Sequence, residues 1–129
     1  KAKELNNEIY FVTSKDLPKG HILINFFLSD ITLNKKNEKF YLFYKNDTPK
    51  ALKFKVKYSK SFQNYIALAT LHKVYIYDRD LKLKKIINFD NKILSLASTK
   101  EYLGVLTKTA NSLSLIIFNK DFKEKKLFL

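Results

Sequence analysis

The residues best suited to do chemistry are lysines at alternate positions of one segment. Lys53, Lys55 and Lys57 are separated by single apolar residues, and alternate residues of a β-strand lie on one face about 6.6 Å apart. This spacing resembles that of successive phosphates along an extended nucleic-acid strand. The pattern therefore predicts a lysine ladder that binds a polyanion. The structural alternative is that lysines on outer strands prevent edge-to-edge aggregation.

Two further groups of lysines extend this candidate basic patch. They occupy corresponding places in two similar segments of the second half of the chain. The first group is Lys82, Lys84 and Lys85, and the second is Lys123, Lys125 and Lys126. Aromatic residues for base stacking are abundant, but the period-two pattern puts Phe54 and Tyr58 on the face opposite the lysines. We therefore expect these two rings to pack in the core.

The balance of charge favours a general attraction to acidic surfaces over sequence-specific recognition. The chain has 25 Lys and Arg against 12 Asp and Glu, a net charge of +13, and Arg79 is its only arginine. Proteins that read base sequence depend on the bidentate fork of arginine, which a lysine does not offer. Part of the charge is also explained by A/T-rich codon usage, which favours Lys, Asn, Ile, Phe and Tyr together.

Residues that commonly serve catalysis or metal binding are sparse. Asp78, Asp80 and Asp121 each follow a run that reads as a strand, and we expect them to cap turns. His21 and His72 lie far apart in a chain without cysteine, so no zinc site is expected. With two glycines there is no Gly-rich phosphate cradle and no glycine-flanked nucleophile turn. We expect no catalysis, no metal and no cofactor, and the absence of cysteine leaves the compartment undetermined.

The elements that must position these residues read as strands. Residues 52–58 alternate strictly between apolar residues and lysine, the pattern of a strand with one buried and one solvated face. Similar runs, rich in β-branched and aromatic residues, are 9–13, 22–28, 40–44, 65–70, 74–77, 83–88, 93–97, 102–107, 113–118 and 125–128. They predict an antiparallel all-β meander of about 10 short strands joined by hairpins. Short helical turns are expected at 3–7 and 15–19, and residues 29–39 read as a polar, candidate functional loop.

Length and composition are those of one folded domain over residues 1–129. The chain is 46% hydrophobic, has neither a Gly-rich nor a Pro-rich linker, and can bury a core without disulfides. Its longest apolar runs are far shorter than the roughly 18 residues of a membrane-spanning helix, so we expect no membrane span. Because the chain starts at Lys1 and contains no methionine, we expect a trimmed product or a piece of a longer chain.

An internal repeat is the most informative feature of the sequence. Residues 76–87 align without gaps on 117–128, a shift of 41, which matches the Lys84-Lys85 pair with Lys125-Lys126. Residues 65–70 match 102–107 at a shift of 37, and a fainter third copy aligns 41–47 with 74–80. The repeat-like units are therefore placed at about 8–50, 51–90 and 91–129.

A repeat near 40 residues with about four short strands has the size of a β-propeller blade. Residues 65–70, 74–78 and 82–88 resemble the second, third and fourth strands of a WD-repeat blade, and Val74-Tyr-Ile-Tyr-Asp78 resembles the family's Val-x-Val-Trp-Asp. The resemblance covers residues 51–129 and implies a propeller-like scaffold. The sequence departs from the family in having no tryptophan, no Gly-His pair before a blade, and Phe118-Asn119 at the second copy.

About three blades fit in the chain, whereas closed propellers have at least four. The open alternatives are a fragment, an assembly with copies of itself or a partner, and a closed β-sandwich or barrel. We expect a non-enzymatic β-scaffold that mediates protein–protein interaction by binding an acidic surface of its partner. Two alternatives remain: sequence-nonspecific binding of nucleic acid or another polyanion by the lysine-rich strands, and a structural segment of a larger β-protein.

Overall fold

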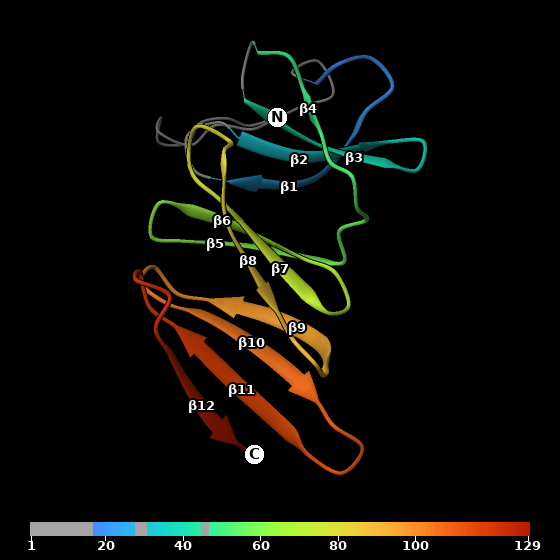
Figure 1. Cartoon of the computed structure of the whole chain (residues 1–129). Helices are drawn as coiled ribbons and strands as arrows, with labels where there is room; N and C mark the ends of the chain where they lie inside the picture. The colour runs from blue at the N-terminus through green and yellow to red at the C-terminus, as the bar shows by residue number, and fades with distance from the viewer. Residues whose placement is uncertain (1–16, 28–30, 45–46) are drawn as a thin grey trace, which may run out of the picture.

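The fold is all-β, as predicted. The computed structural model describes residues 17–27, 31–44 and 47–129, and these contain twelve strands and no helix (Figure 1). The strands are β1 (Ile22–Phe27), β2 (Ile31–Lys36), β3 (Lys39–Tyr44), β4 (Lys50–Ala51), β5 (Tyr58–Phe62), β6 (Tyr65–Ala69), β7 (Lys73–Tyr77), β8 (Leu83–Asn88), β9 (Lys92–Ser98), β10 (Leu103–Lys108), β11 (Leu113–Phe118) and β12 (Glu124–Phe128). The described residues include no helix that could cross a membrane.

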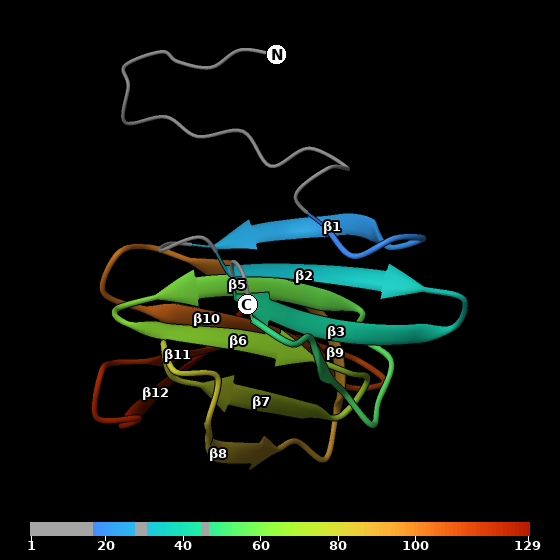
Figure 2. The same cartoon turned by 90° about the horizontal axis from the view of Figure 1, so that it is seen from above.

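The strands form three four-stranded antiparallel meanders. Sheet 1 is β1–β4, sheet 2 is β5–β8 and sheet 3 is β9–β12, and each keeps its strands in chain order. The sheets are stacked in sequence order, with sheet 1 lying over sheet 2 when viewed from above (Figure 2). Their first strands approach one another, since β1 lies against β5 and β5 against β9. None of the three sheets closes on itself, so the alternative of a closed barrel is wrong for the described residues.

Two hydrophobic cores fill the spaces between the sheets. We call the side of a sheet that faces the next sheet along the chain its trailing face, and the opposite side its leading face. In the first core, Leu33 and Leu42 of the trailing face of sheet 1 meet Leu68 of the leading face of sheet 2. In the second core, Ala67 and Ile76 of the trailing face of sheet 2 meet the leading face of sheet 3. Sheet 2 is therefore buried on both faces, which is why β6 is almost continuously apolar.

The structure corrects three segments of the strand prediction. Residues 52–57 alternate in burial as expected but form no strand, and they connect β4 to β5. Residues 29–39, predicted as a polar loop, contain β2, in which Ile31, Thr32, Leu33 and Asn34 are all buried. The sequence did not indicate this strand because Thr32 and Asn34 are polar but buried. Sheet 1 is covered on both faces at this strand, so neither face has the exposed residues that polar positions predict. β5 was not predicted either, because its Ser-Lys-Ser centre gives no apolar alternation.

The helical turn predicted at 15–19 is absent from its described part, residues 17–19. The predicted strand at 9–13 and the helical turn at 3–7 lie outside the described residues. The remaining predicted runs coincide with β1, β3 and β6–β12 to within one or two residues.

The segments that repeat in the sequence form equivalent strands of the three sheets. At two places the structure shifts the sequence alignment by one residue. A β-bulge between Ile76 and Tyr77 places Lys85 opposite Ile76, as Lys125 is opposite Ile117. Lys85 is therefore equivalent to Lys125 and not to Lys126. In the third copy, Leu42 faces the next sheet as Ile76 does, so the structural shift is 34 and the sequence alignment is off by one residue.

Candidate functional site

The nine predicted lysines lie on the connection 52–57 and on the two outer strands β8 and β12 or the turns that lead into them. We call them the lysine band: Lys53, Lys55, Lys57, Lys82, Lys84, Lys85, Lys123, Lys125 and Lys126. All nine side chains are exposed. Among the described residues only Lys55 of this band forms an ion pair, with Nζ 3.5 Å from Glu38 Oε1 and both side chains more than 70% exposed. Such a pair contributes little, so the band keeps almost all of its positive charge available.

The connection 52–57 owes its alternation to packing and not to strand pairing. Leu52 is buried in the first core, and Phe54 and Val56 pack against that core while the lysines between them point outward. The Phe54 ring stacks on Tyr75 of β7 with centroids 3.8 Å apart and planes 7° apart. The predicted ladder on a regular strand is therefore wrong, although Phe54 does face the core as predicted. Tyr58, in β5, packs against the second core.

Contacts between side chains link the parts of the lysine band. Tyr75, on which Phe54 stacks, is the cross-strand partner of Ile86 in β8, so the connection lies beside that strand. Lys85 Nζ lies 5.8 Å from the centroid of the Phe122 ring, in the turn that leads into β12. The band therefore runs from the connection over β8 to β12. The sequence did not reveal this adjacency.

Two equivalent turns lead into the outer strands. Asp78 Oδ1 accepts hydrogen bonds from the backbone N–H of Asp80 (2.8 Å) and Lys82 (3.0 Å). Asn119 Oδ1 accepts from the N–H of Asp121 (2.9 Å) and Lys123 (3.1 Å).

The predicted capping role is thus confirmed for Asp78, whereas Asp80 and Asp121 supply only backbone donors to these turns. Asn119, which departs from the WD-repeat pattern, makes the same cap with its amide oxygen. In both turns the fourth residue has a positive φ, 63° at Leu81 and 60° at Phe122.

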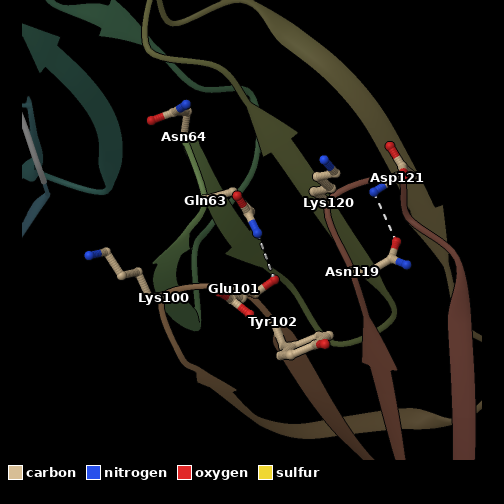
Figure 3. Close-up of a pocket in the computed structure, with 8 residues that line it drawn as sticks. All are labelled: Gln63, Asn64, Lys100, Glu101, Tyr102, Asn119, Lys120 and Asp121. Carbon is tan, nitrogen blue, oxygen red and sulfur yellow. Dashed lines mark hydrogen bonds between the residues drawn. The ribbon is translucent and has the colours of Figure 1, made fainter.

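A polar cleft of about 720 Å³ opens where three turns of sheets 2 and 3 meet (Figure 3). It is lined by Gln63, Asn64, Lys100, Glu101, Tyr102, Asn119, Lys120 and Asp121. The carboxylates of Glu101 and Asp121 and the ammonium groups of Lys100 and Lys120 are exposed to solvent. Groups of both charges in such a setting can bind a polar chain, but the cleft provides no buried acid–base pair.

Gln63 is one of the residues of this cleft that sequence reasoning missed. It has φ 52° in the two-residue turn between β5 and β6, a conformation that costs a non-glycine residue roughly 1–2 kcal/mol. Its backbone N–H donates to the Lys100 carbonyl at 2.7 Å, and its Nε2 donates to the Glu101 carbonyl at 3.1 Å. These bonds tie sheet 2 to the β9–β10 turn. Only the two-residue gap between β5 and β6 could have indicated this turn.

The two histidines have separate structural contacts. His21 Nδ1 lies 2.6 Å from Asn34 Oδ1, and its ring lies 4.7 Å from that of Tyr41. His72 Nδ1 lies 3.3 Å from the Phe89 carbonyl oxygen. Within the described ranges no three His, Asp or Glu side chains gather as metal ligands.

No model of a known protein family matches the chain, and no curated protein matches it. Function is therefore inferred from the surface of the molecule itself.

Proposed function

We propose that this protein is a non-enzymatic β-scaffold that binds an acidic surface of a protein partner through the lysine band. The observation that carries the proposal is the exposure of all nine lysines on three segments linked by side-chain contacts, with Lys55 alone in an ion pair among the described residues. Complementary charge of this kind speeds association and is weakened by salt, because exposed charges are screened over about 8 Å at physiological ionic strength. In this proposal the scaffold is a degenerate WD-repeat-like propeller, and the three four-stranded meanders are its blades.

A protein partner is favoured over nucleic acid by the stacking of Phe54 and by the uneven spacing of the lysines. Binding of single strands combines a basic groove with exposed rings on which bases stack. Phe54, between two lysines of the band, is stacked on Tyr75 and not available to a base, whereas Phe128, which is 75% exposed beside Lys126, lies at the end of β12. The lysines also lie on an irregular connection and on two separate strands, so they do not form one evenly spaced row.

The test compares binding of two fluorescent probes by anisotropy across a salt series. The probes are an oligoglutamate peptide and a mixed-sequence oligonucleotide of equal charge. We expect the peptide to bind with an affinity that falls with salt. The variant Lys53→Glu/Lys55→Glu/Lys57→Glu should weaken peptide binding by at least about tenfold at low salt, since each substitution replaces attraction by repulsion.

The matched control is the triple reversal of Lys92, Lys100 and Lys108, exposed lysines of β9, the β9–β10 turn and β10 that lie outside the band. It changes the net charge equally and should cost much less affinity. Equal losses in the two variants would show that only net charge matters and would contradict a defined site. Tighter binding of the oligonucleotide than of the peptide would favour the polyanion alternative, and no binding of either probe at low salt would overturn the proposal.

A further inference from the structure

The trailing face of sheet 3 has no cover among the described residues, although the equivalent face of sheet 2 is fully covered. On sheet 2 this face presents Ala67, Ala69, Val74 and Ile76, all 0% exposed beneath sheet 3. The repeat places Gly104, Leu106, Leu115 and Ile117 at the same positions of sheet 3. We call these four residues, with Tyr102 and Lys125, the open face.

The open face has the shape and chemistry of a surface between two sheets. Gly104, Leu106, Leu115 and Ile117 are only half-buried, and Tyr102 is 47% exposed. A groove of about 560 Å³ runs over Gly104, Leu115 and Ile117. The equivalent of Gly104 in sheet 2 is Ala67, also a small residue. A small side chain at this position leaves room for the large apolar residues of a neighbouring sheet.

The residues at the edge of the open face indicate which side chains a sheet docked on it would carry. In the second core, Tyr65 packs against Phe122, with ring centroids 5.1 Å apart, and Lys85 Nζ lies over the same ring. The equivalents of Tyr65 and Lys85 on the open face are Tyr102 and Lys125. An occupant with an aromatic residue in a turn like that of Phe122 would meet both of them. Lys123 and Lys125 at the groove would also favour acidic side chains on the occupant.

A second copy of this chain does not fit the open face. The leading faces of sheets 2 and 3 are covered by the preceding sheets. Sheet 1 has Thr32 and Asn34, 3% and 0% exposed, where sheet 2 has Ile66 and Leu68 on its leading face, and His21 lies over Asn34. Two open faces meeting about a two-fold axis would bring the lysines of two chains of net charge +13 together.

We propose that the open face docks a four-stranded β-sheet of a partner protein. The partner's sheet has an aliphatic face like that of Leu103, Val105 and Ile116, an aromatic residue in its last turn and an acidic rim. This contact goes beyond the binding of acidic surfaces by the lysine band, because it is apolar and uses the face of sheet 3 that points away from sheet 2, where only Lys123 and Lys125 of the band lie.

The test supplies such a sheet covalently to the full chain. A second copy of residues 89–129 is joined directly after Phe128, the position equivalent to Asn88, so that its sheet can follow sheet 3 as sheet 3 follows sheet 2. Hydrogen exchange of the β10 and β11 amides is compared with that of the parent chain. We expect exchange at least about tenfold slower in the extended chain, and Tyr102 shielded from a soluble fluorescence quencher.

The substitution Ile117→Lys in the first copy should abolish this protection, because it places a charge between two sheets. The matched control, Ile86→Lys, alters an aliphatic residue that is 42% exposed on β8 and should preserve it. Unchanged exchange in the extended chain would overturn the proposal. A parent chain that sediments as a dimer, and becomes a monomer on Ile117→Lys, would also overturn it by assigning the face to a second copy. Peptide binding by Lys53, Lys55 and Lys57, which lie outside the open face, does not depend on either result.

Discussion

Tyr77 is a phenol enclosed between sheets 1 and 2, and it couples stability to pH. Its side chain is 5% exposed in the first core. Burial raises the pKa of Tyr77 above its usual value of 10.0, and the neighbouring Tyr75 acts in the same direction. In the unfolded chain the phenol ionises near its usual value, so the folded state binds the proton more tightly. The contribution of this group to stability is complete below pH 10 and is lost as pH rises through the folded pKa.

We therefore expect the free energy of unfolding to fall above about pH 10, with a smaller fall in Tyr77→Phe. Urea denaturation between pH 8 and 11 measures this. Tyr102→Phe, a change at a phenol that is 47% exposed, is the control and should follow the parent chain. If Tyr77→Phe and the parent lost stability in parallel, the alkaline transition would have another cause.

At the scale of the element, the two turns before β8 and β12 occupy equivalent places in the repeat. Substitutions in them test whether equivalent residues also make equal contributions to stability. One side-chain oxygen in each turn accepts two backbone N–H groups. Asp78→Ala and Asn119→Ala leave those donors without this acceptor, and each should cost about 1–2 kcal/mol. Asp78→Asn and Asn119→Asp retain the oxygen and should cost less than about 0.5 kcal/mol. Chemical denaturation of the four variants measures these differences.

Asp80→Ala and Asp121→Ala provide the control for this pair of turns. Their backbone N–H groups make the bonds to the caps, and alanine retains those groups. Both variants should remain within about 0.5 kcal/mol of the parent. The capping assignment would fail if the amide and acid exchanges were as costly as the alanine substitutions.

At the scale of the whole molecule, burial on two faces should make sheet 2 the most stable layer. Ile66 and Leu68 pack in the first core, and Ala67 and Ala69 of the same strand pack in the second. Opening β6 exposes both cores, whereas opening β11 exposes one. We expect the β6 and β7 amides to exchange most slowly of all described strands, as measured by hydrogen exchange with mass spectrometry or NMR. Slower exchange in β10 and β11 of the isolated chain would contradict this order.

The local pattern of apolar and polar residues was enough to predict a strand that has one buried and one exposed face, or a strand that is apolar throughout. It located β6, β7, β8 and β11, and the repeat of 41 residues matched two turns that prove to have the same hydrogen bonds. It failed for β2 because Thr32 and Asn34 are buried polar residues, which alternation treats as exposed. It also failed for residues 52–57, because side chains that enter a core at every second position produce the same alternation without a partner strand.

The lysine band also has some features that the sequence predicts and others that only the structure shows. Its nine members and their exposure follow from sequence, because lysines alternate with residues that need burial. Their adjacency does not, since it depends on Phe54 stacking on Tyr75 and on Lys85 reaching Phe122 of the next sheet. The β-bulge between Ile76 and Tyr77 makes Lys85 the lysine that faces sheet 3. The alternation of residues in the sequence does not indicate where such a bulge occurs.

The sequence by itself determined the strand type, the repeat, the basic surface and the lack of any Cys-based or Gly-rich chemistry. These depend on residue types and on neighbours within a few positions. Only the tertiary structure decided that the meanders stack as three open sheets, that Gln63 joins two of them, and that one apolar face is open on sheet 3. Those features arise from contacts between residues distant in the chain, whose free energies depend on how whole sheets pack.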